Sequence, residues 1–346
     1  MAELRTPLCR SLGIEYPILS VGFGISAGPE LVSAVSNAGG CGVLGASSGQ
    51  LPIDELRRRV RRCRELTDRP FGINFLIMDF GDPEATDEDR AWTLDRFRMA
   101  IEERVPVVVL FWGDSSTLVE EAHRGGMTAL VQVGTVAEAR AAAEAGADAI
   151  IAQGVEAGGH VRGTTSIWDV LPAVIDAVDP LPVLASGGIG DGAGIARALG
   201  LGAQGVSMGT RFVASEEAWV HETYKRRVVD AKPEDTFYGQ LFDAGWPAPA
   251  RALKNAAFRD WEAAGSPPSG SRPGEDTDIG VSHFEWGDTP FPRYAPGMLT
   301  PAFDGDPEYG PMWAGESVGA INDLKPAGDI MRDLVRETTS ARGGTR

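Results

Sequence analysis

Residues 182–212 read PVLASGGIGDGAGIARALGLGAQGVSMGTRF, and this stretch decides the fold. A short apolar run from Pro182 to Gly188 ends in a glycine pair. It is followed by the segment Gly192 to Leu199, whose apolar residues recur at three- and four-residue spacing, and then by a second apolar run from Gly205 to Phe212. The pattern predicts a strand, a helix and a second strand, and such units place their strands in parallel with right-handed crossovers.

The same pattern extends back to the beginning of the chain and gives eight apolar runs of buried-strand type. They are Pro17–Gly22, Cys41–Ser47, Phe71–Ile77, Val105–Gly113, Thr128–Gly134, Ala149–Val155, Pro182–Gly188 and Gly205–Phe212. Eight such units predict an α/β fold of the (β/α)8 TIM-barrel type. A doubly wound open sheet is the alternative, but Gly-Phe-Gly at residues 22–24 does not complete the glycine fingerprint that a dinucleotide fold places after its first strand.

The strand-helix alternation ends near Asp230, which divides the chain into three parts. We expect a barrel over residues 1–230, a Pro-, Gly- and Trp-rich irregular extension or cap over residues 231–310, and a helical segment over residues 311–346 that packs back on the barrel. The segment Gly315–Val335 is predicted as one helix, and its small residues would let it approach the barrel mouth closely. Whether the extension covers a pocket or only contributes packing or dimer contacts stays open.

Composition narrows the class of protein and its partners. Among 346 residues 43% are hydrophobic, 23% are charged, and the net charge is −17. That charge argues against nucleic acid and membrane surfaces as partners, and no apolar run is long enough to span a bilayer. The N-terminus lacks a signal peptide pattern, so we expect a cytoplasmic protein. Cys9, Cys41 and Cys63 have neither disulfide nor zinc spacing and are expected to be buried thiols.

Two amides lie inside apolar runs at the catalytic, carboxyl end of the predicted strands. Asn74 interrupts the third run and Gln153 interrupts the sixth. An amide there needs hydrogen-bond partners that hydrophobic neighbours do not supply. The two side chains could form a polar floor for a planar heterocyclic ligand, or each could bond a neighbouring strand. Both interpretations remain open from the sequence.

Glycines gather at the ends of the seventh and eighth predicted strands. The chain has 44 glycines, against an ordinary usage of about 24 for this length. The pair Gly187-Gly188 and the run Ser207–Thr210 lie at the strand pair whose loops commonly hold phosphate in barrels, where backbone N–H groups and a helix N-terminus favour an anion. We therefore expect a phosphate-bearing cofactor, with simple turn glycines as the alternative.

His160 is the candidate catalytic residue. It closes the loop after the sixth predicted strand, at the catalytic face, where an imidazole that titrates near neutrality could take a proton from a substrate. A structural role in the loop is the alternative. His123, His221 and His283 lie in charged or late segments and are expected to be solvated or structural. No cluster of ligand residues at metal-binding spacing accompanies His160, so we expect no metal.

Several motifs together resemble those of the nitronate monooxygenase family, formerly called 2-nitropropane dioxygenases. They are Gly154-Val-Glu-Ala-Gly-Gly-His160, Ala185-Ser-Gly-Gly-Ile-Gly-Asp-Gly192, Met208-Gly-Thr-Arg-Phe212 and Trp313-Ala-Gly-Glu-Ser-Val-Gly-Ala-Ile-Asn322, with Tyr16-Pro-Ile18 and Ala38-Gly-Gly-Cys-Gly-Val43 at the start. The resemblance covers residues 12–230 and 312–330. Flavin-dependent enoyl-acyl-carrier-protein reductases share nearly all of these motifs.

The resemblance implies an FMN-dependent barrel enzyme that oxidises alkyl nitronates, and by extension nitroalkanes, with O2 to a carbonyl compound and nitrite. His160 matches the family histidine that accepts a proton from the substrate's α-carbon. The residues implied to contact or border the flavin are Gly22, Phe23, Asn74, Gln153, Gly158, Gly159, Gly187, Gly188, Ser207, Met208, Gly209 and Thr210. The chain departs from the family at Val21-Gly-Phe23, where Ala-Pro-Met is usual, and this departure implies a reshaped pocket.

Two other functions and the oligomeric state stay open. An NADH- or NADPH-dependent flavin enoyl reductase is the main alternative, since it shares the barrel motifs. A flavin-binding protein without catalytic activity is the third. The expected partners are a small-molecule substrate and O2, with a homodimer left as an open expectation, and the physiological substrate is not specified by these motifs.

Overall fold

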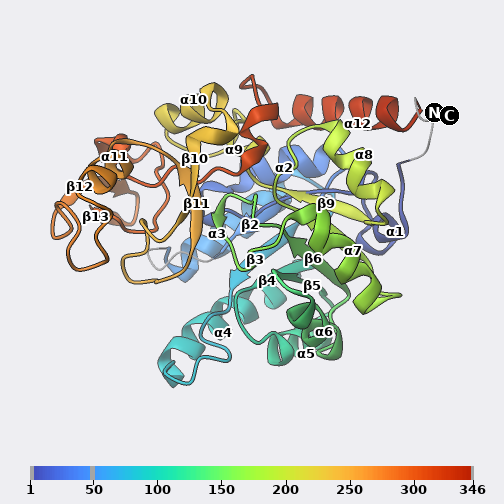
Figure 1. Cartoon of the computed structure of the whole chain (residues 1–346). Helices are drawn as coiled ribbons and strands as arrows, with labels where there is room; N and C mark the ends of the chain where they lie inside the picture. Colours follow the sequence, from blue (N-terminus) through green and yellow to red (C-terminus); the bar gives the residue numbers. More distant parts are fainter. Residues whose placement is uncertain (1–3, 47–50, 344–346) are drawn as a thin grey trace.

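Eight strands form one parallel sheet that curves into a barrel (Figure 1). The structure is a computed structural model that describes residues 4–46 and 51–343; Ser47, the end of the second predicted strand, and the chain termini lie outside these ranges. The strands are β1 (Ile18–Ser20), β2 (Val43–Gly45), β3 (Gly72–Leu76), β4 (Val107–Phe111), β5 (Thr128–Val133), β6 (Ala149–Gln153), β8 (Val183–Ser186) and β9 (Gly205–Met208). Each falls within a predicted run, so the TIM-barrel fold is confirmed.

The strand order is β1-β9-β8-β6-β5-β4-β3-β2, and the two ends of the sheet meet at Cys41. Leu19 pairs in parallel with Cys41, just ahead of β2. The amide of Cys41 donates to the carbonyl of Ile18 and the amide of Ser20 donates to the carbonyl of Cys41, both at 3.0 Å. Main-chain hydrogen bonds therefore continue between β1 and the residue just ahead of β2, the two strands at the ends of the sheet order.

Helices alternate with the strands and surround the sheet. They are α2 (Pro29–Asn37), α3 (Ile53–Leu66), α4 (Asp87–Glu102), α5 (Ser116–Arg124), α6 (Val136–Glu144), α7 (Ile167–Val178) and α8 (Gly192–Gly200), followed after β9 by α9 (Thr210–Val213) and α10 (Glu222–Asp230). Side-chain caps fix several starts. Thr86 forms a capping box with Asp89, and Thr135 and Ser166 accept hydrogen bonds from first-turn amides.

Two hydrophobic layers hold the barrel together. Alternate strand residues such as Leu19, Leu130 and Leu184 fill its interior, and Leu8 and Leu12 of α1 (Pro7–Leu12) join this cluster. The opposite set of strand residues packs against the surrounding helices. Because both faces of each strand are buried, the strands appear in the sequence as continuous apolar runs rather than as alternating ones.

The extension contains two small antiparallel sheets, which corrects the expectation of an irregular segment. One sheet has the order β10-β11-β7 and the other β13-β12-β14. Their bounds are β7 (Gly159–His160), β10 (Thr236–Gly239), β11 (Ala250–Leu253), β12 (Asp278–Phe284), β13 (Gly287–Pro292) and β14 (Phe303–Gly305), with α11 (Ala256–Ala263) between them. Short strands interrupted by Gly and Pro give no clear period-two pattern, so these pairings leave little trace in the sequence.

The C-terminal segment is not the single helix that was predicted over Gly315–Val335. A 3-10 turn, η4 (Glu316–Ala320), is followed by an extended stretch and then by α12 (Ala327–Gly343). Pro326 explains the break, since a proline disfavours helical geometry at the residue before it. The predicted close approach is confirmed at Gly315, where a Cβ would lie 2.5 Å from the carbonyl oxygen of Glu156. α12 packs on α8 and α2.

Candidate functional site

A cavity of about 740 Å³ lies at the carboxyl ends of the barrel strands. Barrel residues that follow β1, β3, β6, β8 and β9 form one part of its wall, and the extension contributes Trp246, Phe284, Phe291 and Met298. Active sites of TIM barrels are built at this end of the barrel. The extension therefore forms part of the cavity wall.

Every residue that the sequence assigned to the site lines this one cavity. The set is His160, Gly22, Phe23, Asn74, Gln153, Gly158, Gly159, Gly187, Gly188, Ser207, Met208, Gly209 and Thr210. These residues are separated by up to 188 positions in the chain, from Gly22 to Thr210, and the barrel brings them to one end. Their contact with a flavin stays a prediction.

Glycines are required along the cavity wall for two different physical reasons. Gly187 and Gly188 have φ values of +97° and +69°, in the left-handed region that other residues rarely adopt. At Gly22 there is no space, because a Cβ would lie 2.6 Å from the Cβ of Asn74. At these positions no side chain stands between the main chain and the cavity. A flat or phosphate-bearing ligand can therefore approach the backbone closely.

Of the two helices that follow the glycine loops, α8 does not offer its N-terminus to a phosphate. Asp191 caps α8 by accepting from the amide of Gly194 at 2.8 Å, and Glu337 of α12 accepts from the amide of Gly192 at 3.0 Å. Two carboxylates thus occupy the positive end of the α8 dipole. The start of α8 is therefore closed to an anion. α9 begins at Gly209 and Thr210 on the cavity wall without a side-chain cap, so a favourable helix terminus stays a prediction there, beside the glycine loops and the hydroxyls of Ser207 and Thr210.

Both amides of the predicted polar floor have partners in the chain. Asn74 Nδ2 donates to the carbonyl of Val109 on the neighbouring strand β4 at 3.3 Å. Gln153 Nε2 donates to the carbonyl of His160 at 3.0 Å, and Gln153 Oε1 accepts from the amide of Arg162 at 3.0 Å. Both ends of the Gln153 amide therefore bind the loop that carries His160. The side chain positions that loop as well as lining the cavity.

His160 is held by the extension as well as by the barrel. It belongs to β7, whose residues Gly159 and His160 pair with Arg251 and Ala250 of β11. Its imidazole stacks on Trp246 at 3.6 Å between ring centroids and lies 5.3 Å from the ring centroid of Trp313. Among the described residues, Nε2 of His160 is buried without a hydrogen-bond partner. The imidazole is therefore fixed in orientation with one nitrogen unused.

The surroundings of His160 make it a weaker base than the sequence suggested. Burial lowers the pKa of its imidazole from 6.5 to about 3. A desolvated cation is costly, and among the residues that the structure describes no carboxylate pairs with the imidazole to offset that cost. The expectation of titration near neutrality is therefore wrong for the free enzyme. The imidazole is neutral at ordinary pH, and it accepts a proton only where a neighbouring negative charge compensates the cation that forms.

The buried imidazole should make folding sensitive to acid. The unfolded chain binds a proton at His160 below pH 6.5 and the folded chain only near pH 3, so stability falls as the pH drops between these values. From pH 7 to pH 5 this contribution amounts to about 2 kcal/mol. Urea denaturation of His160→Asn should show a fall smaller by that amount, whereas exposed His283→Asn should fall like the parent. Equal falls in all three proteins would contradict the assignment.

Residues of the extension around His160 were not identified from the sequence. Trp246 contacts both His160 and Trp112, and the ring centroids of Trp246 and Trp112 are 5.3 Å apart. Trp112 follows β4 with a φ of +71°, an uncommon conformation for a bulky residue. Residues held in such conformations gather at functional sites. The tryptophan content of the extension was the available signal, but it did not show which of the rings would meet His160.

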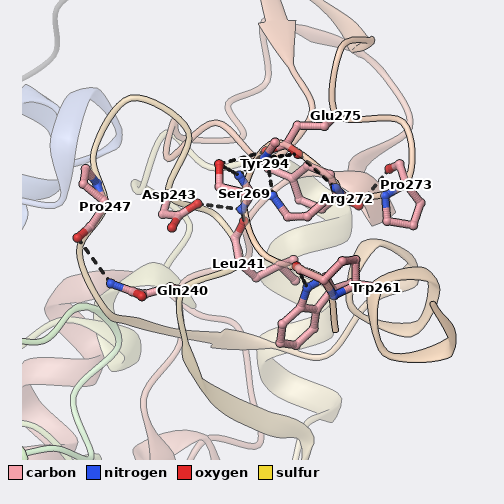
Figure 2. A network of polar contacts seen from close by, with 12 residues as sticks. Gln240, Leu241, Asp243, Pro247, Trp261, Ser269, Arg272, Pro273, Glu275 and Tyr294 are labelled. Atoms are coloured by element: carbon pink, nitrogen blue, oxygen red, sulfur yellow. Dashed lines mark hydrogen bonds and ion pairs between the residues drawn. The ribbon is translucent and has the colours of Figure 1, made fainter. Parts of the chain in front are cut away.

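A buried arginine, Arg272, anchors residues 240–247, which we call the Trp246 loop. Figure 2 shows the two ends of this loop, Gln240 and Pro247, together with Arg272 and its partners. The Arg272 side chain is 1% exposed and lies 2.6 Å from Oδ1 of Asp243. It also donates to the carbonyl of Leu241 at 2.6 Å and to Glu275 through Nε at 2.7 Å. Gln240 Nε2 donates to the carbonyl of Pro247 at 3.3 Å, across the base of the loop. These contacts hold the loop that carries Trp246.

The remaining histidines and the cysteines lie away from the cavity wall. His123 and His283 pair with Asp148 and Asp288 at the surface, and His221 caps α10 by accepting from the amide of Thr223. This confirms the structural roles expected for them. All three cysteines are free and buried, as predicted, and burial raises the pKa of the Cys41 and Cys63 thiols to about 12.

The structure describes residues 4–46 and 51–343, and two features are absent from these ranges. In them, no three His, Cys, Asp or Glu side chains come together as metal ligands would. Within the same ranges, no helix combines the length and the apolar character required to cross a bilayer. The candidate site residues line the cavity at the strand ends.

A family model described as nitronate monooxygenase matches residues 5–337. The chain belongs to this family. It is 30% identical to the nitronate monooxygenase of Paraburkholderia phytofirmans, covering 94% of this chain and 93% of that one. It is 33% identical to the (3aS,4S,5R,7aS)-5-hydroxy-7a-methyl-1-oxo-octahydro-1H-indene-4-carboxyl-CoA dehydrogenase of Mycobacterium tuberculosis, with 96% of each covered. The family resemblance of the motifs is confirmed, and the protein is an enzyme of an oxidoreductase family.

The fold of this chain is shared with a solved structure. The structure of FabK from Thermotoga maritima superposes with a TM-score of 0.80 at 34% identity, over 98% of both chains. The family thus includes relatives named for different reactions. Membership of the nitronate monooxygenase family supports nitronate oxidation as the reaction.

Proposed function

We propose that this enzyme oxidises alkyl nitronates, and nitroalkanes after deprotonation, with O2 to a carbonyl compound and nitrite, using FMN held in the strand-end cavity. The observation that carries the proposal is His160 at the wall of a glycine-lined cavity, with an Nε2 that is covered by neighbouring atoms and has no hydrogen-bond partner among the described residues. Family membership supports the reaction class. A flavin site needs close main-chain approach, and the reaction of a neutral nitroalkane needs a proton acceptor; the cavity offers both.

The residues present fit FMN. Gly187, Gly188 and Gly209 offer main chain without side chains beside the hydroxyls of Ser207 and Thr210, which suits a phosphate. At Gly22 the main chain itself forms part of the wall, since a Cβ there would collide with Asn74 and with the carbonyl of Leu44. Bound FMN would supply the electron acceptor for the substrate and the site of reaction with O2.

His160 would accept the α-carbon proton of a nitroalkane at Nε2. Its low pKa keeps that nitrogen free at ordinary pH. Proton transfer leaves an imidazolium beside an anionic nitronate, and the two opposite charges compensate each other where solvent is excluded. Stacking on Trp246 and the bond from Gln153 to the His160 carbonyl keep the acceptor in place. A preformed nitronate needs no such transfer.

Anaerobic reduction tests the proposal. The purified protein, reconstituted with FMN, is mixed without oxygen with ethyl nitronate, and the oxidised flavin absorbance should disappear. Readmission of O2 should restore the absorbance with release of nitrite and acetaldehyde. A protein that binds FMN but is not reduced by any nitronate would overturn the assigned reaction. Failure to bind FMN at all would overturn the cofactor.

A second candidate function is an NADH- or NADPH-dependent enoyl reductase. It is favoured by the 0.80 TM-score and 34% identity to FabK, an enoyl-acyl-carrier-protein reductase. The relative from Mycobacterium tuberculosis, named for a carboxyl-CoA dehydrogenase, also points to acyl substrates. Rapid loss of flavin absorbance with NADH or NADPH, in the absence of nitronate, would favour this candidate. We expect slow or no reduction by nicotinamides.

A further inference from the structure

We propose that the preferred substrate carries a bulky, uncharged apolar substituent, an aryl or alicyclic group, rather than a hydrogen atom or a carboxylate, beside its nitro or nitronate group. This inference rests on the proposed function and specifies the substrate class of the same site. Two properties of the cavity wall support this inference. One is its aromatic lining, and the other is the sign of the charged side chains that face the cavity.

The first property is the extent of aromatic wall beyond the glycine loops. Trp92 of α4 and Phe111 of β4 come from the barrel, and Trp246, Phe284 and Phe291 come from the extension. Trp313 adds a further ring beside His160. Aromatic surface in a pocket is stabilised by burying apolar ligand surface against it. A two-carbon nitroalkane leaves most of this wall in contact with water, whereas a phenyl group can cover it.

Several of these rings are fixed in place by their neighbours. Phe284 stacks on Trp286 with ring centroids 4.7 Å apart and an interplanar angle of 9°. The indole N–H of Trp313 donates to the carbonyl of Gly297 at 3.3 Å. Phe291 packs edge-on against Phe303 at 5.4 Å. The aromatic wall is therefore preformed, so a bulky substrate need not reorganise it on binding.

The second property is charge. Asp79 and Asp89 line the cavity, and among the described residues no lysine or arginine does. Asp79 accepts a hydrogen bond from Thr93 at 2.9 Å, and Asp89 accepts from the Thr86 hydroxyl and amide, which lowers the pKa of its carboxyl. Arg96 lies behind the wall, stacked on Trp92 at 3.5 Å from the ring centroid and bonded to the carbonyl of Leu51. Asp89 is exposed, so water screens its charge, whereas Asp79 is half-buried. A carboxylate on the substrate would meet the charge of Asp79 without a cationic partner.

A matched series of primary nitroalkanes tests the inference. Nitroethane, (2-nitroethyl)benzene and 3-nitropropionate carry hydrogen, phenyl and carboxylate, respectively, on the same carbon beside the reacting one. We expect kcat/KM for the phenyl compound to exceed that of nitroethane roughly 10- to 100-fold. We expect the carboxylate compound to fall below nitroethane. Equal values, or a preference for 3-nitropropionate, would overturn the inference.

Variants identify the residues responsible. Phe284→Leu should reduce the preference for phenyl over hydrogen several-fold, while Phe258→Leu, in the extension's own hydrophobic cluster and outside the cavity wall, should not change it. Asp79→Asn should raise kcat/KM for 3-nitropropionate relative to nitroethane several-fold, while exposed Asp87→Asn should leave that ratio unchanged. Unchanged ratios in both cavity variants would overturn the inference.

Binding measured separately distinguishes this inference from the proposed function. Quenching of tryptophan fluorescence by each nitroalkane reports its Kd in the FMN-loaded protein. If none of the compounds is oxidised but the phenyl compound binds most tightly, the proposed reaction is wrong and the substrate class stands. If all are oxidised but bind equally, the reaction stands and the substrate class is wrong.

Discussion

Replacing His160 by asparagine is expected to lower kcat/KM for a neutral nitroalkane roughly 100- to 10,000-fold, the range that a positioned general base contributes. Asparagine is similar in shape to part of the imidazole but cannot accept a proton. Oxidation of a preformed nitronate needs no deprotonation, so its kcat/KM should change by less than about 10-fold. Steady-state oxygen consumption with nitroethane and with ethyl nitronate measures both values.

The control for this variant is a histidine that does not line the cavity. His283→Asn removes an exposed imidazole paired with Asp288 and should leave both rates unchanged. The flavin content of each protein should be determined, so that loss of cofactor is not counted as loss of base. Equal losses for nitroethane and its nitronate in His160→Asn would show that His160 acts in binding or structure and not as the base.

Replacing Arg272 by methionine is expected to destabilise the protein by about 3–5 kcal/mol, the cost of removing one partner from a buried ion pair. The Asp243 side chain is 8% exposed and that of Glu275 15%, so both carboxylates would be left largely buried without their cation. The carbonyl of Leu241 and the hydroxyl of Ser269 would lose their donor as well. Urea denaturation monitored by tryptophan fluorescence measures the change.

A matched surface variant separates burial from charge. Arg226→Met also removes an ion pair, with Glu222, but these side chains are 73% and 59% exposed, and we expect less than about 1 kcal/mol. Arg272→Met should also loosen the Trp246 loop and admit water to His160, which raises the pKa of its imidazole toward 6.5. A similar small loss of stability in the two variants would contradict the anchoring role.

The barrel and the cavity wall could be predicted because their signals are local. A strand buried on both faces is a continuous apolar run, and a loop that must approach a ligand or adopt a positive φ needs glycine. Residues such as Gly187, Gly188 and His160 follow predicted strands directly, and the parallel arrangement brings such positions to one end of the barrel. Their place in the fold followed from where the strands end.

Partners distant in the chain could not be predicted in this way. Glu337 reaches the first turn of α8 across 145 positions and closes the start of that helix to an anion. The break in the segment after Gly315 is different, because its cause, Pro326, is a local signal that the helical spacing hid. Spacing within a segment does not report which distant group will meet it.

The sequence by itself determined the eight-stranded barrel, the glycine loops and the presence of a histidine at the catalytic end. The tertiary structure decided what that histidine can do. Pairing of Gly159 and His160 with β11, and stacking of the imidazole on Trp246, remove water from it and lower its pKa to about 3. Burial and charge depend on all the groups around an atom, and those groups are brought together only when the chain has folded.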